Sequence, residues 1–373
     1  MRKLCRIELL AILLCLLFSI YATAQNEMTQ WQKSKHADRE LPANDVGVWE
    51  LRQLDTAHCG RCHTEQGFVA WVPQLMRGDP SPLKKPNGQN ADEAFIKGLG
   101  LTKADVQPIT CSACHSEGSK LRITNDIPML PNGIPVRAAG KGALCMACHN
   151  TRNGRTQWDT SDPKKYDQPH DASQADVLLG KNAFFFNDTG STESPHGAFV
   201  GDSCVTCHKA LSTGGHQFTP ASCDNCHGNK VQKAFVQNGV ADLQAQVATA
   251  ITKRIMATKD KVACVVSWDP KADKNTPNAA VDGKQITAVE IPPGIHGQIS
   301  LMFTLQNGQQ IYSQMGNIKD ACGAQGKPVW PTSDPVVRAL WNHYLFTYDG
   351  SKGVHNPRFA RSVLAATLEA ISK

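Results

Sequence analysis

Apolar residues follow a helical period in one stretch of the second half of the chain. They recur at steps of three and four residues, at Val236, Val240, Leu243, Val247, Ile251 and Ile255. Residues spaced in this way lie on one face of an α-helix. The pattern therefore predicts a long helix over 231–260, ending near Lys259.

A different pattern follows, with runs of β-branched and aromatic residues between turn residues. The runs are ITAVEI at 286–291, QISLMFTL at 298–305 and QIYSQM at 310–315. Pro292-Pro293-Gly294 and Asn307-Gly308 separate them, and such residues favour turns. These features predict a small antiparallel β-rich insertion over 261–325.

Helix signals return after the insertion, over 326–373. Ser333-Asp334-Pro335 and Asn356-Pro357 each place a capping side chain directly before a proline, which is typical of a helix N-terminus. The second of these helices has an apolar face, at Phe359, Val363, Leu364, Leu368 and Ile371. We therefore expect a helical segment that ends in a long C-terminal helix packed against the rest of the fold.

The N-terminal segment 1–24 has the pattern of a secretory signal peptide. Arg2, Lys3 and Arg6 precede an apolar run over Leu9–Ile20, and a small-residue cleavage sequence follows it. The apolar run is too short for a transmembrane helix, which needs about 20 apolar residues, so no membrane span is expected after cleavage. We expect an exported protein in the periplasm, with the outer surface or the cell exterior as alternatives.

The cysteines point to the chemistry of the chain, because Cys-x-x-Cys-His occurs five times. The copies are CGRCH (Cys59, Cys62, His63), CSACH (Cys111, Cys114, His115), CMACH (Cys145, Cys148, His149), CVTCH (Cys204, Cys207, His208) and CDNCH (Cys223, Cys226, His227). In this motif two thiols bind one porphyrin covalently, and the histidine is the proximal ligand of the iron. Zinc sites and thioredoxin-like redox pairs also use Cys-x-x-Cys, but neither requires the histidine. The motifs predict five covalently attached haem c groups.

The placement of the motifs predicts how the chain is organised. They begin at 59, 111, 145, 204 and 223, at uneven intervals that argue against a solenoid of identical units. The chain offers roughly 70 residues per haem, too few for a separate protein core around each one. We expect a mainly α-helical, loop-rich and haem-packed body over 25–230, completed by 326–373. The short last interval predicts that the fourth and fifth haems lie close together.

Two cysteines, Cys264 and Cys322, lie outside both the motifs and the signal peptide. They lie near the two ends of the predicted β-rich insertion. In an exported protein they predict a structural disulfide, with two buried thiols as the alternative.

The sixth coordination position of each iron bears most directly on function. A second imidazole closes the iron for electron transfer, whereas an open position can bind a substrate. The histidines outside the motifs are His36, His58, His170, His196, His216, His296, His343 and His355. They are sufficient to close all five irons.

Several of these histidines lie in segments that resemble a known group, the multihaem cytochromes c related to pentahaem nitrite reductase, hydroxylamine oxidoreductase and the octahaem reductases. The segments are WQKSKHA around His36, QPHDASQADVLLG around His170, SPHG around His196, GGHQF around His216 and YDGSKGVHNPRFARSVL around His355. The resemblance implies that these five histidines are distal haem ligands. It also implies a haem-packed fold, in which the HNP segment opens the long C-terminal helix.

The other three histidines are judged from their positions. His58 directly precedes the first motif, so its backbone is held beside one haem and it is a further candidate for a distal ligand. His296 lies in the turn GIHG and His343 in an aromatic helical segment. We expect both to be structural.

The chain departs from the resembled group at the catalytic features. The nitrite reductases bind their catalytic haem through Cys-x-x-Cys-Lys, whereas all five motifs here end in histidine. Nothing identifies the tyrosine that crosslinks the catalytic haem of hydroxylamine-type enzymes. We therefore expect no catalytic residues, and an electron carrier of anaerobic respiration with mostly bis-His haems.

Two other functions stay open at this point. One is a multihaem reductase of nitrogen or sulfur oxyanions, of the nitrite, hydroxylamine or tetrathionate type, with one open haem. The other is a subunit of an extracellular cytochrome filament, which associates with copies of itself.

The net charge of the chain bears on which kinds of partner it could bind. Its net charge is +6, and the negative propionates of the haems would offset this surplus. The composition therefore gives no support for nucleic-acid binding. The expected partners are redox proteins: other cytochromes, a quinol-oxidising membrane module or a terminal acceptor.

Overall fold

The structure is a computed structural model of the chain. It describes residues 28–38, 55–117, 120–154, 166–187, 193–208, 221–228, 233–269, 274–277, 279–295 and 297–373. The predicted signal peptide, His216 and His296 lie outside these ranges. Within them, the chain is mostly helical with small antiparallel sheets.

The chain divides into two compact units. Unit 1 comprises Met1–Met129, Pro135–Cys148 and Val200–Val231, and unit 2 comprises Leu130–Ile134, His149–Phe199 and Gln232–Lys373. Four motifs belong entirely to unit 1. The two cysteines of the third motif belong to unit 1, and its histidine, His149, belongs to unit 2.

Unit 1 consists of short helices joined by loops. They are η1 (Lys35–Ala37), α3 (Asp55–His63), α4 (Glu65–Met76), α5 (Glu93–Gly98), α6 (Cys111–Cys114), η3 (Gly140–Gly142), α7 (Ala143–Met146), α11 (Cys204–Cys207) and α12 (Ala221–His227). α3 and α4 approach closely at Gly67, where a Cβ would collide with the Gly60 carbonyl. Thr64 caps α4 by accepting a hydrogen bond from the Gly67 amide at 3.0 Å.

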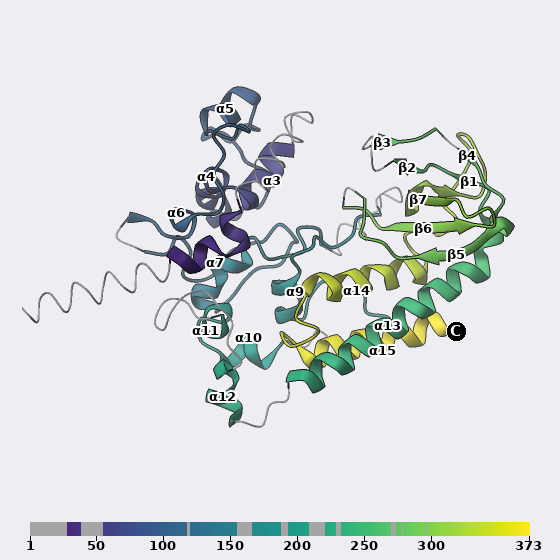
Figure 1. Cartoon of the computed structure of the whole chain (residues 1–373). Helices are drawn as coiled ribbons and strands as arrows, with labels where there is room; N and C mark the ends of the chain where they lie inside the picture. Colours follow the sequence, from purple (N-terminus) through teal and green to yellow (C-terminus); the bar gives the residue numbers. More distant parts are fainter. Residues whose placement is uncertain are drawn as a thin grey trace, which may run out of the picture. The chain divides into compact units, whose positions relative to one another are not determined.

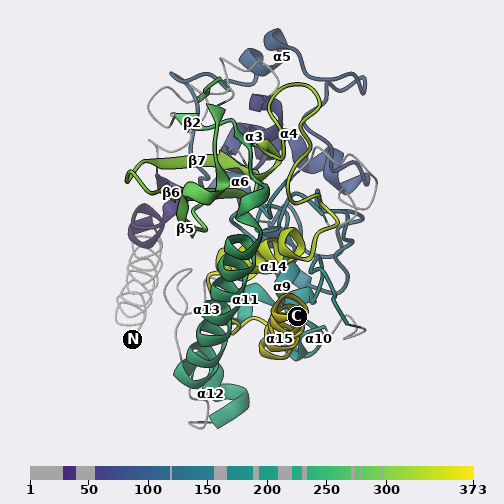
Figure 2. The same cartoon turned by 90° about the vertical axis from the view of Figure 1, so that its right-hand side faces the viewer.

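Unit 2 is built on three long helices that lie side by side (Figure 1, Figure 2). They are α13 (Lys233–Thr258), α14 (Pro335–Asp349) and α15 (Pro357–Ser372), and the shorter α9 (Gln174–Leu179) and α10 (Pro195–Phe199) precede them. Asp334 caps α14 by accepting from the Val336 amide at 2.8 Å, and Asn356 caps α15 by accepting from the Phe359 amide at 3.2 Å. The predicted helices and their N-termini are confirmed. No helix within the described ranges has the length and apolar character to cross a membrane.

Short strands follow α13 in unit 2, with 3-10 turns between them. They are η5 (Lys259–Lys261), β1 (Cys264–Val265), β2 (Trp268–Asp269), β3 (Lys274–Asn275), β4 (Ala279–Ala280), η6 (Gly283–Gln285), β5 (Ile286–Glu290), β6 (Ser300–Leu305), β7 (Gln310–Gln314), η7 (Met315–Asn317) and β8 (Ile318–Lys319). The sheets have the orders β5-β6-β7, β4-β1-β8 and β2-β3, and their paired strands are antiparallel. The three predicted strand runs correspond to β5, β6 and β7.

The disulfide predicted for the β-rich segment is present. It joins Cys264 in β1 to Cys322 after β8, with the two Cα atoms 5.0 Å apart. The alternative of two buried thiols is therefore wrong. The bond ties together the two ends of the β-rich segment.

The hydrophobic cluster of unit 2 packs the helices against the sheet β5-β6-β7. Four residues of the predicted apolar face of α13 are fully buried in it: Val240, Val247, Ile251 and Ile255. Leu301 and Phe303 of β6 meet them, together with residues of α14 and α15. Burial of these side chains stabilises unit 2 by about 1.5–3 kcal/mol each.

Candidate functional site

Each of the five motifs forms a helical turn. The first ends α3, the second and fourth form α6 and α11, and the fifth lies in α12. The third begins in α7 and continues as a turn, in which the Cys148 amide donates to the Cys145 carbonyl at 3.2 Å. Residues three apart on a helical turn lie on the same face. Each turn therefore presents two thiols together, with a histidine directly after them.

The ten motif cysteines, all within the described ranges, are thiols, in contrast to the disulfide of the β-rich segment. Burial raises the pKa of Cys114 to about 11. Burial also raises the pKa of Cys207, and the nearby Cys223 of the fifth motif adds to the effect. The fourth and fifth motifs therefore lie close together in unit 1.

Thiols of other motifs also meet in unit 1. A hydrogen bond with Cys204, and then burial, raises the pKa of Cys145. A hydrogen bond with Cys62, and then burial, raises the pKa of Cys148 in the same way. The third motif therefore contacts the fourth motif through one thiol and the first motif through the other.

Glu65 joins the first motif to the second. It begins α4, two residues after His63. Its carboxylate accepts hydrogen bonds from the Ser112 hydroxyl at 2.6 Å and from the Thr110 hydroxyl. These two residues flank Cys111, the first cysteine of the second motif. Hydrogen bonds to an ionised acceptor are roughly twice as strong as neutral ones, so this contact holds the two motifs close.

The segment before the third motif crosses the segment before the fourth. Lys141 forms an ion pair with Asp202 at 2.9 Å, and the Ser203 hydroxyl donates to the Ala139 carbonyl at 3.1 Å. At Gly142 a Cβ would lie 2.8 Å from the Asp202 carbonyl oxygen and would collide with the Ser203 hydroxyl. Asp202 and Ser203 have φ values of 59° and 36°, a strained conformation that the crossing holds in place. Only glycine allows this approach.

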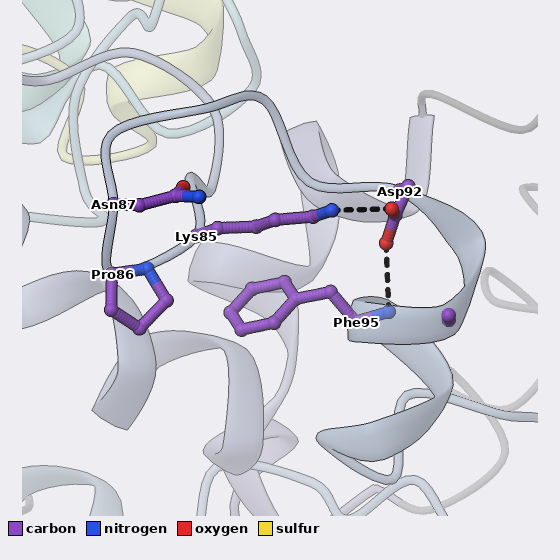
Figure 3. Close-up of a pocket in the computed structure, with 6 residues that line it drawn as sticks. Lys85, Pro86, Asn87, Asp92 and Phe95 are labelled. Atoms are coloured by element: carbon purple, nitrogen blue, oxygen red, sulfur yellow. Dashed lines mark hydrogen bonds and ion pairs between the residues drawn. The ribbon is translucent and has the colours of Figure 1, made fainter.

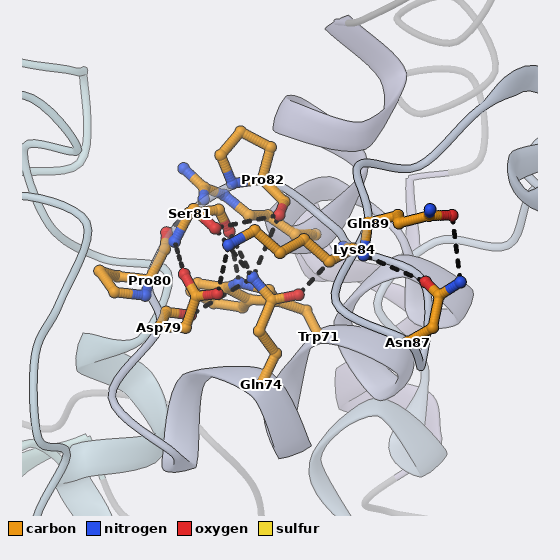
Figure 4. Close-up of polar contacts among 10 residues, drawn as sticks. Trp71, Gln74, Asp79, Pro80, Ser81, Pro82, Lys84, Asn87 and Gln89 are labelled. Atoms are coloured by element: carbon orange, nitrogen blue, oxygen red, sulfur yellow. Dashed lines mark hydrogen bonds and ion pairs between the residues drawn. The ribbon is translucent and has the colours of Figure 1, made fainter.

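The loop after α4 is tied to the first motif (Figure 4). Trp71 and Gln74 of α4 both donate to the Ser81 carbonyl, each at 3.0 Å. Arg61, inside CGRCH, is 2 % exposed, lies 5.0 Å from the Trp71 ring centre and donates to the Pro80 carbonyl. These contacts fix the helical turn that presents the first pair of thiols.

Gln174 of α9 connects the histidine of the third motif to the end of α14. Its Oε1 lies 3.3 Å from His149 Nδ1, and its Nε2 donates to the Asp349 carbonyl at 3.3 Å. Burial lowers the pKa of His149, and the neighbouring His355 and His170 lower it further. The hydrogen bond with Gln174 acts in the opposite direction. The ring is therefore neutral, and with Nδ1 engaged it presents Nε2 for a metal ion.

Ser194 brings two more predicted ligands together. Its buried hydroxyl donates to the His355 carbonyl at 2.8 Å and accepts from the His196 amide at 3.1 Å. The His170 amide donates to the Thr151 carbonyl at 3.0 Å, just after the third motif. The histidine cluster of unit 2 consists of His149, His170, His196 and His355.

His355 is held most firmly among the cluster. Its Nδ1 lies 2.6 Å from Oδ1 of Asp349, whose side chain is fully buried. The Ser351 hydroxyl and, at 3.3 Å, the Ser351 amide donate to the other carboxylate oxygen. The His355 amide donates to the Ser351 hydroxyl at 3.2 Å. The contact at Nδ1 therefore orients the ring, and Nε2 is the nitrogen that would bind a metal ion.

The remaining candidate histidines have different surroundings. His36 is exposed in η1, and His58 is half-buried in α3. Burial lowers the pKa of His343 in α14 to about 4, as expected for a neutral structural imidazole. His216 and His296 lie outside the described residues, so their assignments stay predictions.

The donor set fits covalently bound haem c. The paired thiols suit thioether attachment, and the engaged Nδ1 atoms of His149 and His355 suit axial ligation. Among the described residues, His, Cys, Asp and Glu do not gather in groups of three or more that could hold a metal ion by themselves. Haem iron requires no such group, because the porphyrin supplies its equatorial ligands.

The sequence patterns did not predict Glu65, Gly142, Gln174 or Asp349. Glu65 and Gly142 each lie within three residues of a motif, and Asp349 lies in the segment YDGSKGVH that ends at His355. Gln174 lies in the segment QPHDASQADVLLG, four residues after His170. Closeness in sequence to a predicted ligand is therefore the signal that could have marked all four.

A surface pocket lies between the loop before α5 and the start of α5 (Figure 3). It has a volume of about 470 Å³ and is lined by Lys85, Pro86, Asn87, Asp92, Ala94 and Phe95. Asp92 pairs with Lys85 and caps α5 by accepting from the Phe95 amide at 3.0 Å. None of its lining residues is a predicted haem ligand, so the pocket is not the candidate site.

Comparisons with known proteins give one distant likeness. No protein-family model matches the chain, and no curated protein matches it. Among solved structures it is similar to the crystal structure of the outer cell wall cytochrome OcwA, with a TM-score of 0.46 and 16% sequence identity. The match covers 92% of this chain and 50% of that protein, so the chain spans half the length of the protein it matches. A likeness at this distance assigns no function.

Proposed function

We propose that this protein is an exported pentahaem c-type cytochrome that relays electrons between redox partner proteins in anaerobic respiration. The haem-binding body would comprise 25–230, completed by the C-terminal segment 326–373. Covalent haem c would supply the one-electron chemistry. The five Cys-x-x-Cys-His motifs, each on a helical turn, support this cofactor.

The roles of the residues follow from the motifs and the resemblance. In each motif the two cysteines would attach one haem, and the proximal ligands would be His63, His115, His149, His208 and His227. The distal ligands would be His36, His170, His196, His216 and His355, with His58 as a further candidate. The neutral ring of His149 and the oriented rings of His149 and His355 support their part of this assignment.

The observation that best supports a relay is that the motifs lie close to one another. Glu65 bonds the first motif to the second, and the crossing at Gly142 holds the third against the fourth. The thiols of Cys145 and Cys204 meet directly. Closely spaced haems would let an electron move from one to the next without leaving the protein.

The segments without motifs would serve as a scaffold. Helix 231–260 and the β-rich insertion 261–325 contain no Cys-x-x-Cys-His. α13 packs against both α14 and α15, and His355 lies in the short connection between these two helices. We infer that the scaffold fixes the position of this ligand.

Partners and location follow from the same proposal. Electrons would come from another cytochrome or a quinol-oxidising membrane module and would leave to a further cytochrome or a terminal acceptor. The N-terminal signal pattern supports export, with the periplasm as the proposed location.

The test is the response of the oxidised, fully loaded protein to small ligands. A relay with closed haems leaves its visible spectrum unchanged when cyanide or nitrite is added. It also fails to oxidise reduced methyl viologen in the presence of nitrite, hydroxylamine or tetrathionate. A high-spin component that disappears with cyanide, together with viologen oxidation, would instead identify a reductase.

A further inference from the structure

Two pairs of aspartate and histidine occur in the histidine cluster, and they differ in burial. Asp349 lies 2.6 Å from His355 Nδ1, and its side chain is fully buried. Asp171 lies 2.8 Å from His170 Nδ1 but accepts no hydrogen bond from that atom, and its side chain is 70% exposed. Water and salt screen an exposed charge, whereas a buried carboxylate is screened much less.

The Asp349 carboxylate is built into the end of α14. It is the last residue of that helix, and Gly350 follows it with a φ of 66°. Ser351 donates to it through both its hydroxyl and its amide, and Gln174 donates to its backbone carbonyl. The carboxylate is therefore fixed before any metal group binds, and its charge is directed at His355.

A second contact fixes the connection that carries His355. Gly353 has a φ of 85°, and a Cβ there would lie 2.6 Å from a methyl carbon of Val240 in α13. Ser194 holds the His355 carbonyl from the other side at 2.8 Å. These contacts hold the backbone that carries the His355 imidazole.

We propose that Asp349 is a positioning residue that sets the reduction potential of the haem bound by His355. This inference rests on the proposed function above. A carboxylate that accepts the Nδ1 proton makes the other ring nitrogen a stronger electron donor. Stronger donation favours the ferric over the ferrous state and lowers the potential. This haem would then be among the more strongly reducing sites of the relay, whereas His170, with its exposed partner, would give its haem a smaller shift.

The test compares Asp349→Asn with Asp171→Asn in the haem-loaded protein. Asparagine can keep a hydrogen bond to His355 but lacks the charge. In Asp349→Asn, the reduction potential of one of the five haems should rise by about 59 mV. For a one-electron couple, this rise lowers the ferric-to-ferrous ratio of that haem about tenfold at a fixed applied potential. All haems should remain low-spin. Asp171→Asn should change the corresponding ratio by less than about twofold, because its charge is already screened.

A double variant assigns the effect to His355. His355→Ala should leave five attached haems, one of which becomes high-spin. Adding Asp349→Asn to His355→Ala should then change no potential further, because the coupling between the two residues is already lost.

Three results would overturn the inference: unchanged potentials in Asp349→Asn, an equal shift in the His355→Ala background, or a fully low-spin spectrum of His355→Ala. Failure of the proposed function is distinct, because it would appear in the unaltered protein as fewer than five haems or as a high-spin component.

Discussion

The two units of the chain differ in what holds them together. Unit 2 has a hydrophobic cluster that runs through α13, α14, α15 and the sheet β5-β6-β7. Unit 1 carries all ten motif cysteines, partly on helical turns of four residues, as in α6 and α11. Turns of this length are not stable by themselves in water. Unit 1 buries apolar side chains such as Trp71 and Leu75, but none of its residues belongs to the hydrophobic cluster of unit 2. We therefore expect unit 1 to depend on bound haem for part of its apolar core, whereas unit 2 has a core of its own.

The contacts between motifs in unit 1 agree with this view. Glu65, Asp202 and Lys141 join motif segments through charged and polar contacts at the surface of the turns. Such contacts fix which turns are neighbours, but exposed ion pairs contribute only about 0–1 kcal/mol each. The larger part of the stabilisation would come from the haems.

Loss of the third haem should have the largest effect. The double variant Cys145→Ala/Cys148→Ala removes the thiols that meet the first and fourth motifs, so unit 1 should lose stability on the scale of a whole domain, about 5–15 kcal/mol. Haem analysis should give four haems per chain. Hydrogen exchange should become fast in unit 1 while α13, α14 and α15 stay protected. Unchanged protection in unit 1 would contradict the comparison.

Loss of the disulfide should affect unit 2 alone. Cys264→Ser/Cys322→Ser should lower the free energy of unfolding by about 2–4 kcal/mol. Five haems and an unchanged visible spectrum should remain, because no motif belongs to the β-rich segment. Denaturant unfolding followed by tryptophan fluorescence measures the first effect, and haem absorbance checks the second. A loss of haem would show that the two units depend on each other.

A methyl group at Gly142 should separate the third motif from the fourth. Gly142→Ala places a Cβ against Asp202 and Ser203, which should cost about 1–3 kcal/mol. It should also slow electron exchange between the two haems, which fast photoreduction can follow. Gly98→Ala is the matched control, since no described atom lies within 4 Å of its added Cβ. The control should be neutral or stabilising by up to about 1 kcal/mol.

The destabilising effect of His343 is absent at neutral pH and appears only in acid. Burial lowers the pKa of this histidine to about 4, so between pH 6.5 and 4 the unfolded chain binds a proton that the folded chain does not. Its contribution to stability is therefore present above pH 6.5 and is lost as the pH falls through this window. His343→Leu should remove this loss, at most about 1.4 kcal/mol per pH unit. Thermal unfolding at several pH values measures it, and a new high-spin haem would show that His343 is a ligand.

The sequence predicted the elements whose signals are local. The apolar face of α13, the caps Asp334 and Asn356, and the strand runs of the β-rich segment each depend on neighbouring residues. The pairing of Cys264 with Cys322 was predictable because no other cysteine remained outside the motifs and the signal peptide. These regularities need no knowledge of distant contacts.

The arrangement of the candidate site could not be predicted in the same way. The bond from Ser112 to Glu65 spans 47 residues, and the crossing of Ala139 with Ser203 spans 64. No periodic pattern in the sequence predicts either contact. The pairing of Asp349 with His355 is closer in sequence, but its effect depends on the burial of the carboxylate, which only the packed structure reveals.

The central claim is that five closed haems form one relay, and low-temperature electron paramagnetic resonance tests it most directly. The measurement counts ferric spins in oxidised protein of known haem content. We expect five haems per chain, all in low-spin signals, with fast-relaxing or broadened signals from neighbouring pairs. A high-spin signal amounting to a whole haem, or fewer than five haems per chain, would contradict it.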